Sequence, residues 1–337
     1  MSGVATRDDV ARLAGVSAST VSYAISGRRR ISEATRERVL EAMRELDYTP
    51  NAFARGLAGA RKGIIALNYP LRDEGWSPME VRYFETATQA AHECGFHLLL
   101  WPNAADDVTT LTHLVSQQLV DGVIVMEVQW DDPRVALFRE RDVRFVLLGR
   151  NSDPSGLTYV DTDFRESART ALEYLVDRGH RHILFVGENR VEQGHGPMVR
   201  TITELEASAR RFGVSLDRFA GPRTYGTGRA AYRYLAASGA PITAAIVFND
   251  QATVGFINAA QLAGVSVPGD LSVLSIGMGE EAAEVDPPVT TITPPVAALT
   301  DTAVRMLIGA VEGHPVTQSE VLMDAPLVER GSVRDLT

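Results

Sequence analysis

Two different rhythms of hydrophobic positions divide the chain. From residue 64 onward, short apolar runs alternate with longer amphipathic stretches, which predicts strands and helices in turn. Strands are expected at 64–67, 96–100, 122–126, 144–148, 183–186, 244–248 and 271–276, and helices at 80–93, 165–178, 199–212, 228–237 and 251–263. Continuously apolar strands are typical of parallel sheets with both faces buried. The pattern and its length therefore predict an α/β body of two doubly wound subdomains.

The first 60 residues show only helical spacing. Val10, Leu13 and Ala14 predict the inner face of a first helix, and Gly15 suits the tight turn after it. Ser17 is placed to cap a second helix that runs to residue 25. A third helix is expected from residue 32 to 46, with a core stripe that includes Val39, Leu40, Met43 and Leu46. We therefore predict a small all-α helix-turn-helix head.

The outer face of the second helix carries the candidate base-reading residues. Small polar side chains near the beginning of that helix can approach base edges in the major groove. Ser17, Ala18, Ser19, Ser22 and Tyr23 lie on this face, and the basic run 28–30 with Arg29 and Arg30 follows. The alternative is a three-helix bundle without a DNA-binding role.

The charge is distributed unevenly between these regions. The formal net charge of −10 alone argues against nucleic-acid binding. However, residues 1–62 hold 11 Lys and Arg against 7 Asp and Glu, whereas the remaining residues hold 22 against 36. A basic head on an acidic body is expected when only one end meets phosphate, although chance clustering of a few arginines would look the same.

Specific motifs resemble the lactose/galactose repressor (LacI/GalR) family of transcription regulators. The matching runs in the head are 9–22, 35–39 and 46–59. Further matches in the body include 161–163, 179–181, 248–251, 267–273, 287–292 and 330–332. The resemblance implies a DNA-binding domain at 1–49, a hinge helix and linker at 50–61, and an effector-binding and dimerisation domain at 62–337. The last divides into an N-subdomain (about 62–162 plus 294–322) and a C-subdomain (about 163–293 plus 323–337) of the periplasmic-binding-protein type.

The hinge helix that the resemblance implies is only about two turns long. Isolated helices of this length are marginal in water, and the resemblance implies that this one orders only when two protomers sit on the operator. There Leu57 would wedge into a base step of the minor groove; otherwise it is a linker residue packed on the body. The implied DNA-binding residues are Thr6, Ser17, Ala18, Ser19, Thr20, Ser22, Tyr23, Arg29, Arg30, Asn51, Ala54, Arg55 and Leu57.

The resemblance also implies an effector cleft between the two subdomains, at the carboxyl ends of the strands. The candidate effector-binding residues are Tyr69, Glu127, Arg200, Tyr225, Asn249 and Asp250. Arg200 matches the family pattern imperfectly, because the spacing to Gly213 is one residue too long. Gly277 and Pro294 stand where relatives commonly carry polar or acidic side chains, so a plain monosaccharide is less certain as the effector. Glu280 and Glu281 could substitute for the missing carboxylate or could face solvent.

Other classes of protein are disfavoured. The chain has no apolar run of membrane-spanning length, and Cys94 is its one cysteine. Because the first residues lack an apolar segment, we expect no secretory signal. The run Gly277-x-Gly279-x-x-Ala282 imitates a dinucleotide fingerprint, but a lone pattern of this kind is weak. We expect no enzyme activity, no cofactor and no metal site. A solute-binding protein would lack the basic head; a regulator controlled by a protein corepressor remains an alternative.

These inferences predict a cytoplasmic, nucleoid-associated transcription regulator. It would act as a homodimer on a pseudo-palindromic double-stranded operator, as a repressor of a carbohydrate or related metabolic operon. A small molecule, possibly a sugar or sugar derivative, would control it.

Overall fold

The computed structural model describes residues 5–26, 29–48, 62–70, 75–104, 107–190, 194–315 and 317–337. The chain forms two compact units: residues up to 64 together with 114–121, and all remaining residues. The three helices of the first unit's N-terminal part are called the head below, and the second unit is called the body. In the part of the chain that the structure describes, no helix is long and apolar enough to cross a membrane.

The head is built from α1 (Arg7–Ala14), α2 (Ala18–Ser26) and α3 (Glu33–Glu45). A capping box begins α1, where Thr6 accepts from the backbone N–H of Asp9 and the Asp9 side chain accepts from that of Thr6. Gly15 ends α1 with φ +63°, the left-handed conformation that glycine adopts without strain. Ser17 accepts from the backbone N–H of Thr20 at 3.1 Å, so its predicted capping role is confirmed.

The core of the head is made of small side chains. Its buried members are Val10, Ala11, Ala14, Val21, Ala24, Val39 and Ala42. Two leucines that were predicted to be core residues are largely exposed, Leu13 by 45% and Leu40 by 42%. That part of the prediction is wrong, because three short helices that meet through alanines leave room for one narrow stripe on each helix.

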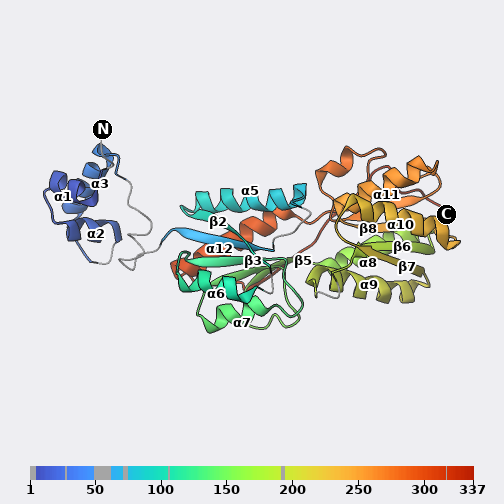
Figure 1. The fold of residues 1–337 in the computed structure, drawn as a ribbon, viewed down its shortest axis with the longest axis horizontal. Helices are drawn as coiled ribbons and strands as arrows, with labels where there is room; N and C mark the ends of the chain where they lie inside the picture. The colour runs from blue at the N-terminus through green and yellow to red at the C-terminus, as the bar shows by residue number, and fades with distance from the viewer. Residues whose placement is uncertain are drawn as a thin grey trace. The chain divides into compact units, whose positions relative to one another are not determined.

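The first sheet of the body has the strand order β11-β5-β4-β3-β1-β2, and the pairs from β11 through to β1 are parallel. Its strands are β1 (Ile64–Tyr69), β2 (His97–Pro102), β3 (Gly122–Met126), β4 (Phe145–Leu148), β5 (Tyr159–Thr162) and β11 (Glu320–Met323). The helices α5 (Pro78–Glu93) and α12 (Val296–Glu312) share one hydrophobic core with this sheet. The helices α6 (Val108–Ser116) and α7 (Pro133–Glu140) lie on the opposite side (Figure 1). This layered unit is the first subdomain.

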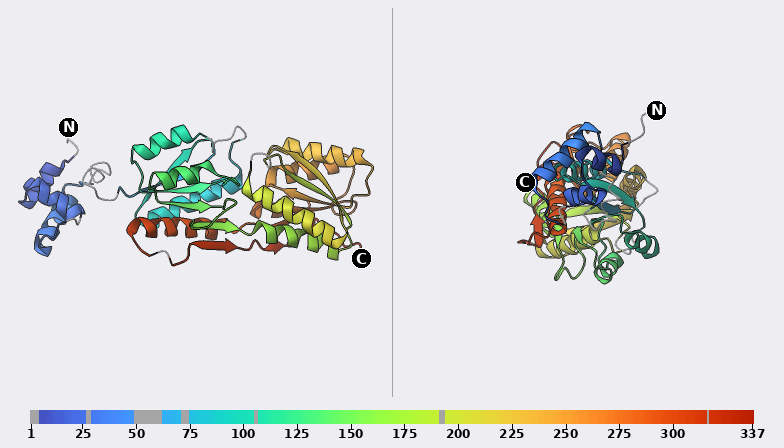
Figure 2. Two further views of the ribbon diagram at one scale, coloured as in Figure 1. Left: turned by 90° about the horizontal axis from the view of Figure 1, so that it is seen from below. Right: turned by 90° about the vertical axis from the view of Figure 1, so that its left-hand side faces the viewer.

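The second sheet repeats the same arrangement with the order β12-β10-β9-β8-β6-β7. Its strands are β6 (His182–Glu188), β7 (Ser215–Gly221), β8 (Ala244–Phe248), β9 (Ser272–Ile276), β10 (Thr290–Ile292) and the antiparallel β12 (Leu327–Val328). Two cores flank it: α8 (Phe164–Asp177) and α9 (Gly196–Phe212) on one face, and α10 (Tyr225–Ser238) and α11 (Asp250–Leu262) on the other (Figures 1 and 2). A short 3-10 helix, η1 (Glu280–Ala283), precedes β10. This unit is the second subdomain.

The chain passes between the subdomains three times, after β5, after β10 and after β11. The pair Pro294-Pro295 lies on the second passage, between β10 and α12. Both sheets are doubly wound, with β1 beside β3 and β6 beside β8 at the points where the strand order reverses. The predicted fold class, a helical head with a body of two doubly wound subdomains, is therefore confirmed.

Several elements were missing from the prediction. The strand β7 carries polar residues at an edge of the second sheet, and β11 and β12 are short edge strands, so none of them has the apolar run of a central strand. The helix α12 is apolar over much of its surface because it is buried against the first sheet, which hides the amphipathic spacing on which the prediction relied.

Candidate functional site

The head presents a face of hydroxyl groups at the beginning of α2. The Ser17 hydroxyl lies 2.7 Å from that of Ser19 and 2.8 Å from that of Thr20. Ser17 and Ser19 are exposed, whereas Ala18, Thr20 and Ser22 are half-buried. The hydroxyls therefore hold one another in place at the exposed N-terminus of the helix, where backbone N–H groups are available to phosphate.

Aromatic and basic groups extend this face. The guanidinium of Arg29 lies 5.9 Å from the centre of the Tyr23 ring, and both Arg29 and Arg30 are exposed. Thr6 is also exposed, and its hydroxyl donates to Asp9 at 2.6 Å as part of the α1 cap. Four further predicted DNA-binding residues, together with the hinge helix, lie outside the described residues: Asn51, Ala54, Arg55 and Leu57.

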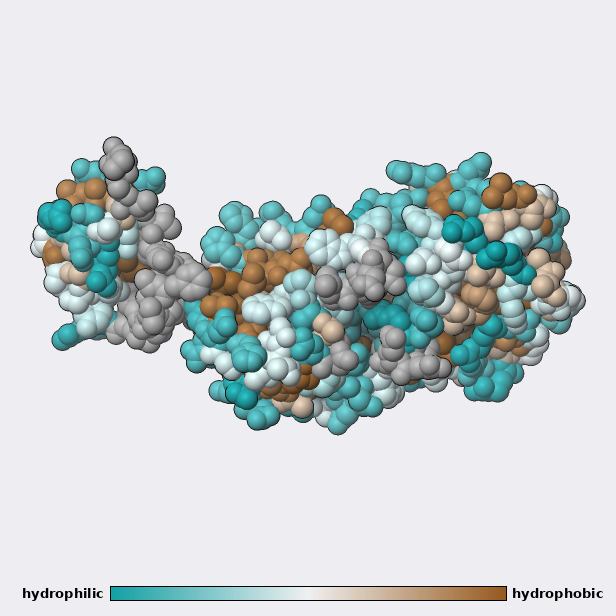
Figure 3. Space-filling model, viewed as in Figure 1, coloured by the Kyte–Doolittle hydropathy of each residue, from teal (hydrophilic) through white to brown (hydrophobic). Residues whose placement is uncertain are grey.

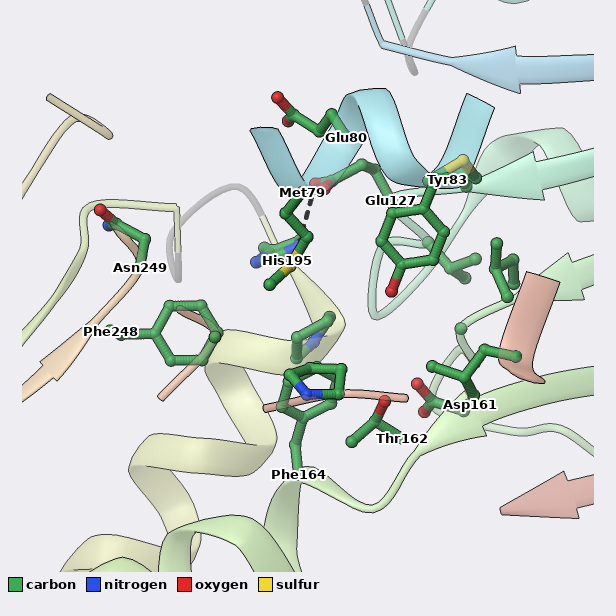
Figure 4. Close-up of a pocket in the computed structure, with 18 of the residues that line it drawn as sticks. Met79, Glu80, Tyr83, Glu127, Asp161, Thr162, Phe164, His195, Phe248 and Asn249 are labelled. Carbon is green, nitrogen blue, oxygen red and sulfur yellow. Dashed lines mark ion pairs between the residues drawn. The ribbon is translucent and has the colours of Figure 1, made fainter. Parts of the chain in front are cut away.

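The body contains a cavity of about 110 Å³ at the carboxyl ends of strands from both sheets. One water needs roughly 10–15 Å³, so the cavity has room for a small organic molecule. Its wall includes residues from or just after β3, β4, β5, β6, β8 and β9, and residues of α5 and α9 (Figure 4). The aromatic rings on this wall belong to Tyr83, Phe164 and Phe248, and Tyr83 points into the cavity in Figure 4. Such a wall offers apolar ring faces beside polar groups.

Carboxylates and cations from the two subdomains meet across the cavity. Glu127, which follows β3, lies 2.6 Å from the Arg190 guanidinium and 3.0 Å from Nε2 of His195. Arg190 also pairs with Glu188 at 3.3 Å. Figure 4 shows the Glu127–His195 pair. These contacts tie the end of β3 in the first subdomain to the region after β6 in the second.

A second bridge is formed by Glu80 of α5 and Arg223, which precedes α10. They lie 2.9 Å apart, and Arg223 also donates to the hydroxyl of Ser77 at 2.8 Å. Asp250 lies 3.6 Å from the same guanidinium. Each of the two arginines on the cavity wall, Arg190 and Arg223, is therefore already matched by at least two carboxylates.

Burial shifts several of these groups. It raises the pKa of Asp161 to about 6, although Arg200 and Arg150 act in the opposite direction. Burial also raises the pKa of the Tyr83 hydroxyl, and the charge of Glu127 adds to this effect. The pKa of His195 is lowered by burial and then by Arg190, and Glu127 opposes that change. A neutral His195 can donate through Nε2 to Glu127.

The structure brings some of the predicted effector-binding residues to the cavity and not others. Glu127 and Asn249 line it. Asp250 is outside the lining, and burial raises the pKa of its carboxyl group. Tyr69 lies outside the lining: it is fully buried and its hydroxyl donates to Glu80. Tyr225 is 50% exposed at the beginning of α10 and also lies outside the lining.

Arg200 is turned away from the cavity. Its guanidinium donates to the backbone oxygens of Arg150 and Asn151 at 2.8 Å each, and it lies 5.1 Å from the Trp130 ring centre. It is nearly fully buried, and burial lowers its pKa to about 10. In this conformation Arg200 joins the two subdomains through the backbone after β4.

The two departures from the family pattern lie on the cavity wall. Gly277 and Pro294 both contribute to the lining. Glu280 and Glu281 lie outside that lining. Glu280 instead pairs with Arg82 at 2.6 Å, and Glu281 accepts from the backbone N–H of Gly279 at 2.7 Å. Neither therefore replaces the missing carboxylate in this structure.

The sequence prediction missed several residues that line the cavity: Glu80, Tyr83, Asp161, Phe164, Glu188, Arg190, His195, Arg223 and Phe248. Asp161, Glu188 and Phe248 lie at carboxyl ends of strands, so strand position could have signalled them. Tyr83 and Glu80 come from the beginning of α5, and strand ends give no signal for a helix that reaches the cavity from the side.

Comparisons with known proteins agree with both parts of this geometry. Residues 6–51 match the model described as "Bacterial regulatory proteins, lacI family", and residues 172–333 match that of a "Periplasmic binding protein-like domain". The chain is 30% identical over 342 residues to the HTH-type transcriptional repressor PurR of Erwinia tasmaniensis, and the match covers 98% of each chain. The chain belongs to the LacI family. The predicted resemblance is thereby confirmed, and this LacI-family protein is a DNA-binding transcription regulator with an effector-binding domain.

Solved structures extend the comparison. A transcriptional regulator CelR–cellobiose complex is 26% identical with a TM-score of 0.74, and the match covers 97% of this chain and 99% of that one. A lac repressor dimer bound to operator and the anti-inducer ONPF is 24% identical with a TM-score of 0.84, covering 98% and 100%. The second likeness concerns the fold. The relatives named here are transcription regulators rather than enzymes.

Proposed function

We propose that this LacI-family regulator is a homodimeric repressor that binds a pseudo-palindromic operator and releases or tightens its hold when a small molecule fills the body cavity. The observation that carries the proposal is the cavity itself, since its charged wall joins both subdomains in a chain that also has a helix-turn-helix head. A ligand that changes the contacts between subdomains has different affinities for the two states of the body, which is what coupling requires.

The cavity chemistry favours a neutral effector that carries hydroxyl groups, such as a sugar or sugar derivative. The rings of Tyr83, Phe164 and Phe248 offer apolar faces, while Glu127, Asp161 and Asn249 supply acceptors and an amide. A ligand with a fixed negative charge would be repelled by the four carboxylates on the cavity wall. The two arginines on the wall are already paired with carboxylates, so they would offset this repulsion little. The related CelR was solved with cellobiose, which supports the class of ligand. We propose that the regulated genes serve carbohydrate or related metabolism. We also propose that the protein acts in the cytoplasm, where it associates with the nucleoid.

Dimerisation would use the first subdomain's edge. The strand β2 is an edge strand of the first sheet, and its Leu98 and Leu100 are only partly buried. Val81 of α5 is exposed, and Figure 3 shows hydrophobic residues gathered where α5 and β2 lie. The similarly folded lac repressor was solved as a dimer on operator. Two heads in one dimer would meet two half-sites.

Selection of randomised DNA duplexes by the full-length protein tests the DNA part of the proposal. The expected product is a pseudo-palindrome, with half-site centres about one helical turn, roughly 10 base pairs, apart or a multiple of it. Sedimentation of the protein–DNA complex should give two chains per duplex. An enriched site without dyad symmetry, occupied by one chain, would contradict the homodimer.

Calorimetry with a matched panel tests the effector part. Glucose and cellobiose represent neutral sugars, glucuronate and glucose 6-phosphate represent anions, and hypoxanthine represents an aromatic base without hydroxyl-bearing carbons. We expect binding of a neutral sugar, and we expect Tyr83→Ala to weaken it while Tyr234→Ala, on the exposed side of α10, leaves it unchanged. Binding of an anion but of no neutral sugar, or an equal loss of sugar affinity in both variants, would contradict the proposal of a neutral sugar effector in this cavity.

A further inference from the structure

One fully buried arginine lies directly behind the cavity wall without lining it. Arg134 is the second residue of α7, and its side chain is completely excluded from solvent together with that of Asp132. Its Nε donates to Oδ1 of Asp132 at 2.9 Å, and its Nη2 donates to Oδ2 at 2.7 Å. A bidentate pair of this kind fixes the plane of the guanidinium as well as its position.

The remaining donors of Arg134 bind the end of β3. Nη2 donates to the backbone oxygen of Met126 at 3.0 Å and to that of Glu127 at 3.2 Å. Glu127 adopts φ +53°, in the left-handed region that is unfavourable for a residue with a Cβ. Hydrogen bonds to the carbonyls on both sides of its Cα stabilise that conformation, and the conformation directs the Glu127 side chain toward Arg190 and His195.

A third contact anchors the arginine to β1. Nη1 of Arg134 donates to Oδ1 of Asn68 at 2.8 Å, and the Asn68 amide in turn donates to the backbone oxygen of Trp101 at 3.2 Å and to the side chain of Asn103. The guanidinium is therefore held directly from β1, from the end of β3 and from the cap of α7, and through Asn68 it is connected to the end of β2. Packing alone would not need a charge here, because a buried ion pair is commonly no more stable than apolar side chains of similar volume.

We propose that Arg134 is a positioning residue for Glu127: it fixes the turn after β3 so that the Glu127 carboxylate reaches His195 and Arg190 of the second subdomain. The inference deepens the proposed function, since it assigns control of one wall of the proposed effector cavity. Its role is distinct from that of a ligand contact, because Arg134 acts only through Glu127.

The imidazole signals of His195 give a direct readout by NMR in the full-length protein without effector. Among the described residues, Nε2 of His195 has Glu127 as its partner, and Nδ1 is buried without a hydrogen-bond partner. Glu127 acts to raise the pKa of His195 against burial and Arg190, and Glu188 acts weakly in the same direction. Loss of the Glu127 contact should therefore lower the pKa of His195 further and change the Nε2 chemical shift.

Four variants make the comparison. His195→Gln assigns the signals among the 7 histidines, and Glu127→Ala defines the full effect. Arg134→Lys keeps the charge beside Asp132 but cannot form the fork that reaches both carbonyls and Asn68. Arg139→Lys is the matched control, since Arg139 lies on the same helix but is exposed and donates to Ser155 and Gly156.

We expect Arg134→Lys to reproduce at least half of the His195 shift caused by Glu127→Ala, while Arg139→Lys leaves His195 unchanged. If a folded Arg134→Lys protein shows wild-type His195 signals, the proposal is overturned. Should that variant fail to fold, Asp132→Asn with Arg134→Met removes both buried charges together and keeps a capping side chain, and the same criterion applies. The measurement contains no effector, so its failure would leave the sugar proposal intact, and failure of the sugar panel would leave this one intact.

Discussion

The head and the cavity of the body carry binding surfaces of opposite construction. The head's hydroxyl face comes from consecutive residues of one helix, beginning at Ser17, and its geometry is set by the local hydrogen bonds of a cap. The cavity takes its wall from two sheets and from helices far apart in the chain, between Met79 and Leu299. A local surface tolerates change in one residue at a time, whereas an assembled one depends on the packing of elements that never touch the ligand.

The largest effect that this comparison predicts comes from a residue that is part of neither binding surface. A Cβ at Gly255 of α11 would stand 2.1 Å from the backbone oxygen of Tyr225, so Gly255→Ala must push α10 and α11 apart. We expect the body to lose roughly 3 kcal/mol, as seen in urea unfolding followed by the fluorescence of Trp76, Trp101 and Trp130, all of which lie in the body. Gly226→Ala, whose Cβ would meet its nearest atom at 3.4 Å, is the control. Equal urea midpoints for Gly255→Ala and Gly226→Ala would contradict the view that the body depends on the close packing of α10 against α11.

A second effect concerns the assembled cavity and pH. Asp161 has a pKa of about 6 in the folded protein against an ordinary value of 3.8, so the folded state holds its proton more tightly. Stability from this group is present when the pH is below about 4 and is lost as the pH rises through 6, by about 3 kcal/mol in total. Asp161→Asn should therefore lose about that much less stability than the wild type between pH 4 and pH 6. Parallel stability curves would show that Asp161 titrates as an ordinary carboxyl.

A third effect tests the local surface. Tyr23→Ala should change the preference for the base at one operator position by about tenfold, since a base contact contributes about 1–3 kcal/mol of discrimination. Arg30→Gln, by contrast, should weaken binding to all duplexes evenly and reduce the salt dependence by about one phosphate contact. Competition binding with single-position operator variants at several salt concentrations separates the two. Uniform loss for Tyr23→Ala would remove it from the base-reading set.

The smallest effect separates capping from DNA contact within the head. Ser17→Ala removes the acceptor for the Thr20 N–H and should cost about 1 kcal/mol of head stability. Ser32→Ala removes the corresponding cap of α3 at Thr35 and should cost a similar amount. Hydrogen exchange of the two helices in the full-length protein measures both losses. Only Ser17→Ala should also weaken operator binding; equal DNA affinity in the two variants would limit Ser17 to capping.

The same contrast explains what could be predicted from the sequence. The turn at Gly15 and the cap at Ser17 depend on neighbouring residues, and both were predicted correctly. The exposure of Leu13 and Leu40 was not, because helical spacing gives a face but not its width. In the body, most of the buried inner strands were predicted from their apolar runs. The inner strands β5 and β10 were not, because polar residues interrupt them. The polar edge strand β7 and the buried helix α12 also lack the patterns on which such predictions rest.

The position of the cavity could be predicted from the sequence, but most of the residues that line it could not. The rule that ligands meet the carboxyl ends of parallel strands pointed to the region of Glu127 and Asn249, and both residues line the cavity. It did not say which face of the sheet a side chain takes, so Tyr69, at the end of β1, lies in the core against Glu80 and Phe84. Nor could spacing along α9 reveal that Arg200 turns to the carbonyls of Arg150 and Asn151, since that contact joins residues about 50 positions apart.

The three passages of the chain between the subdomains also determine the order in which the elements of the two sheets are synthesised on the ribosome. The first sheet is begun at β1 but acquires its edge strand β11 and its covering helix α12 only after the whole second sheet, apart from β12, has been made. The hydrophobic face of β3, β4 and β5 that α12 covers must therefore stay open while more than 130 further residues are synthesised. Because exposed apolar surface is prone to aggregation, a nascent chain that stops before residue 296 should be the form of this protein that depends most on chaperones.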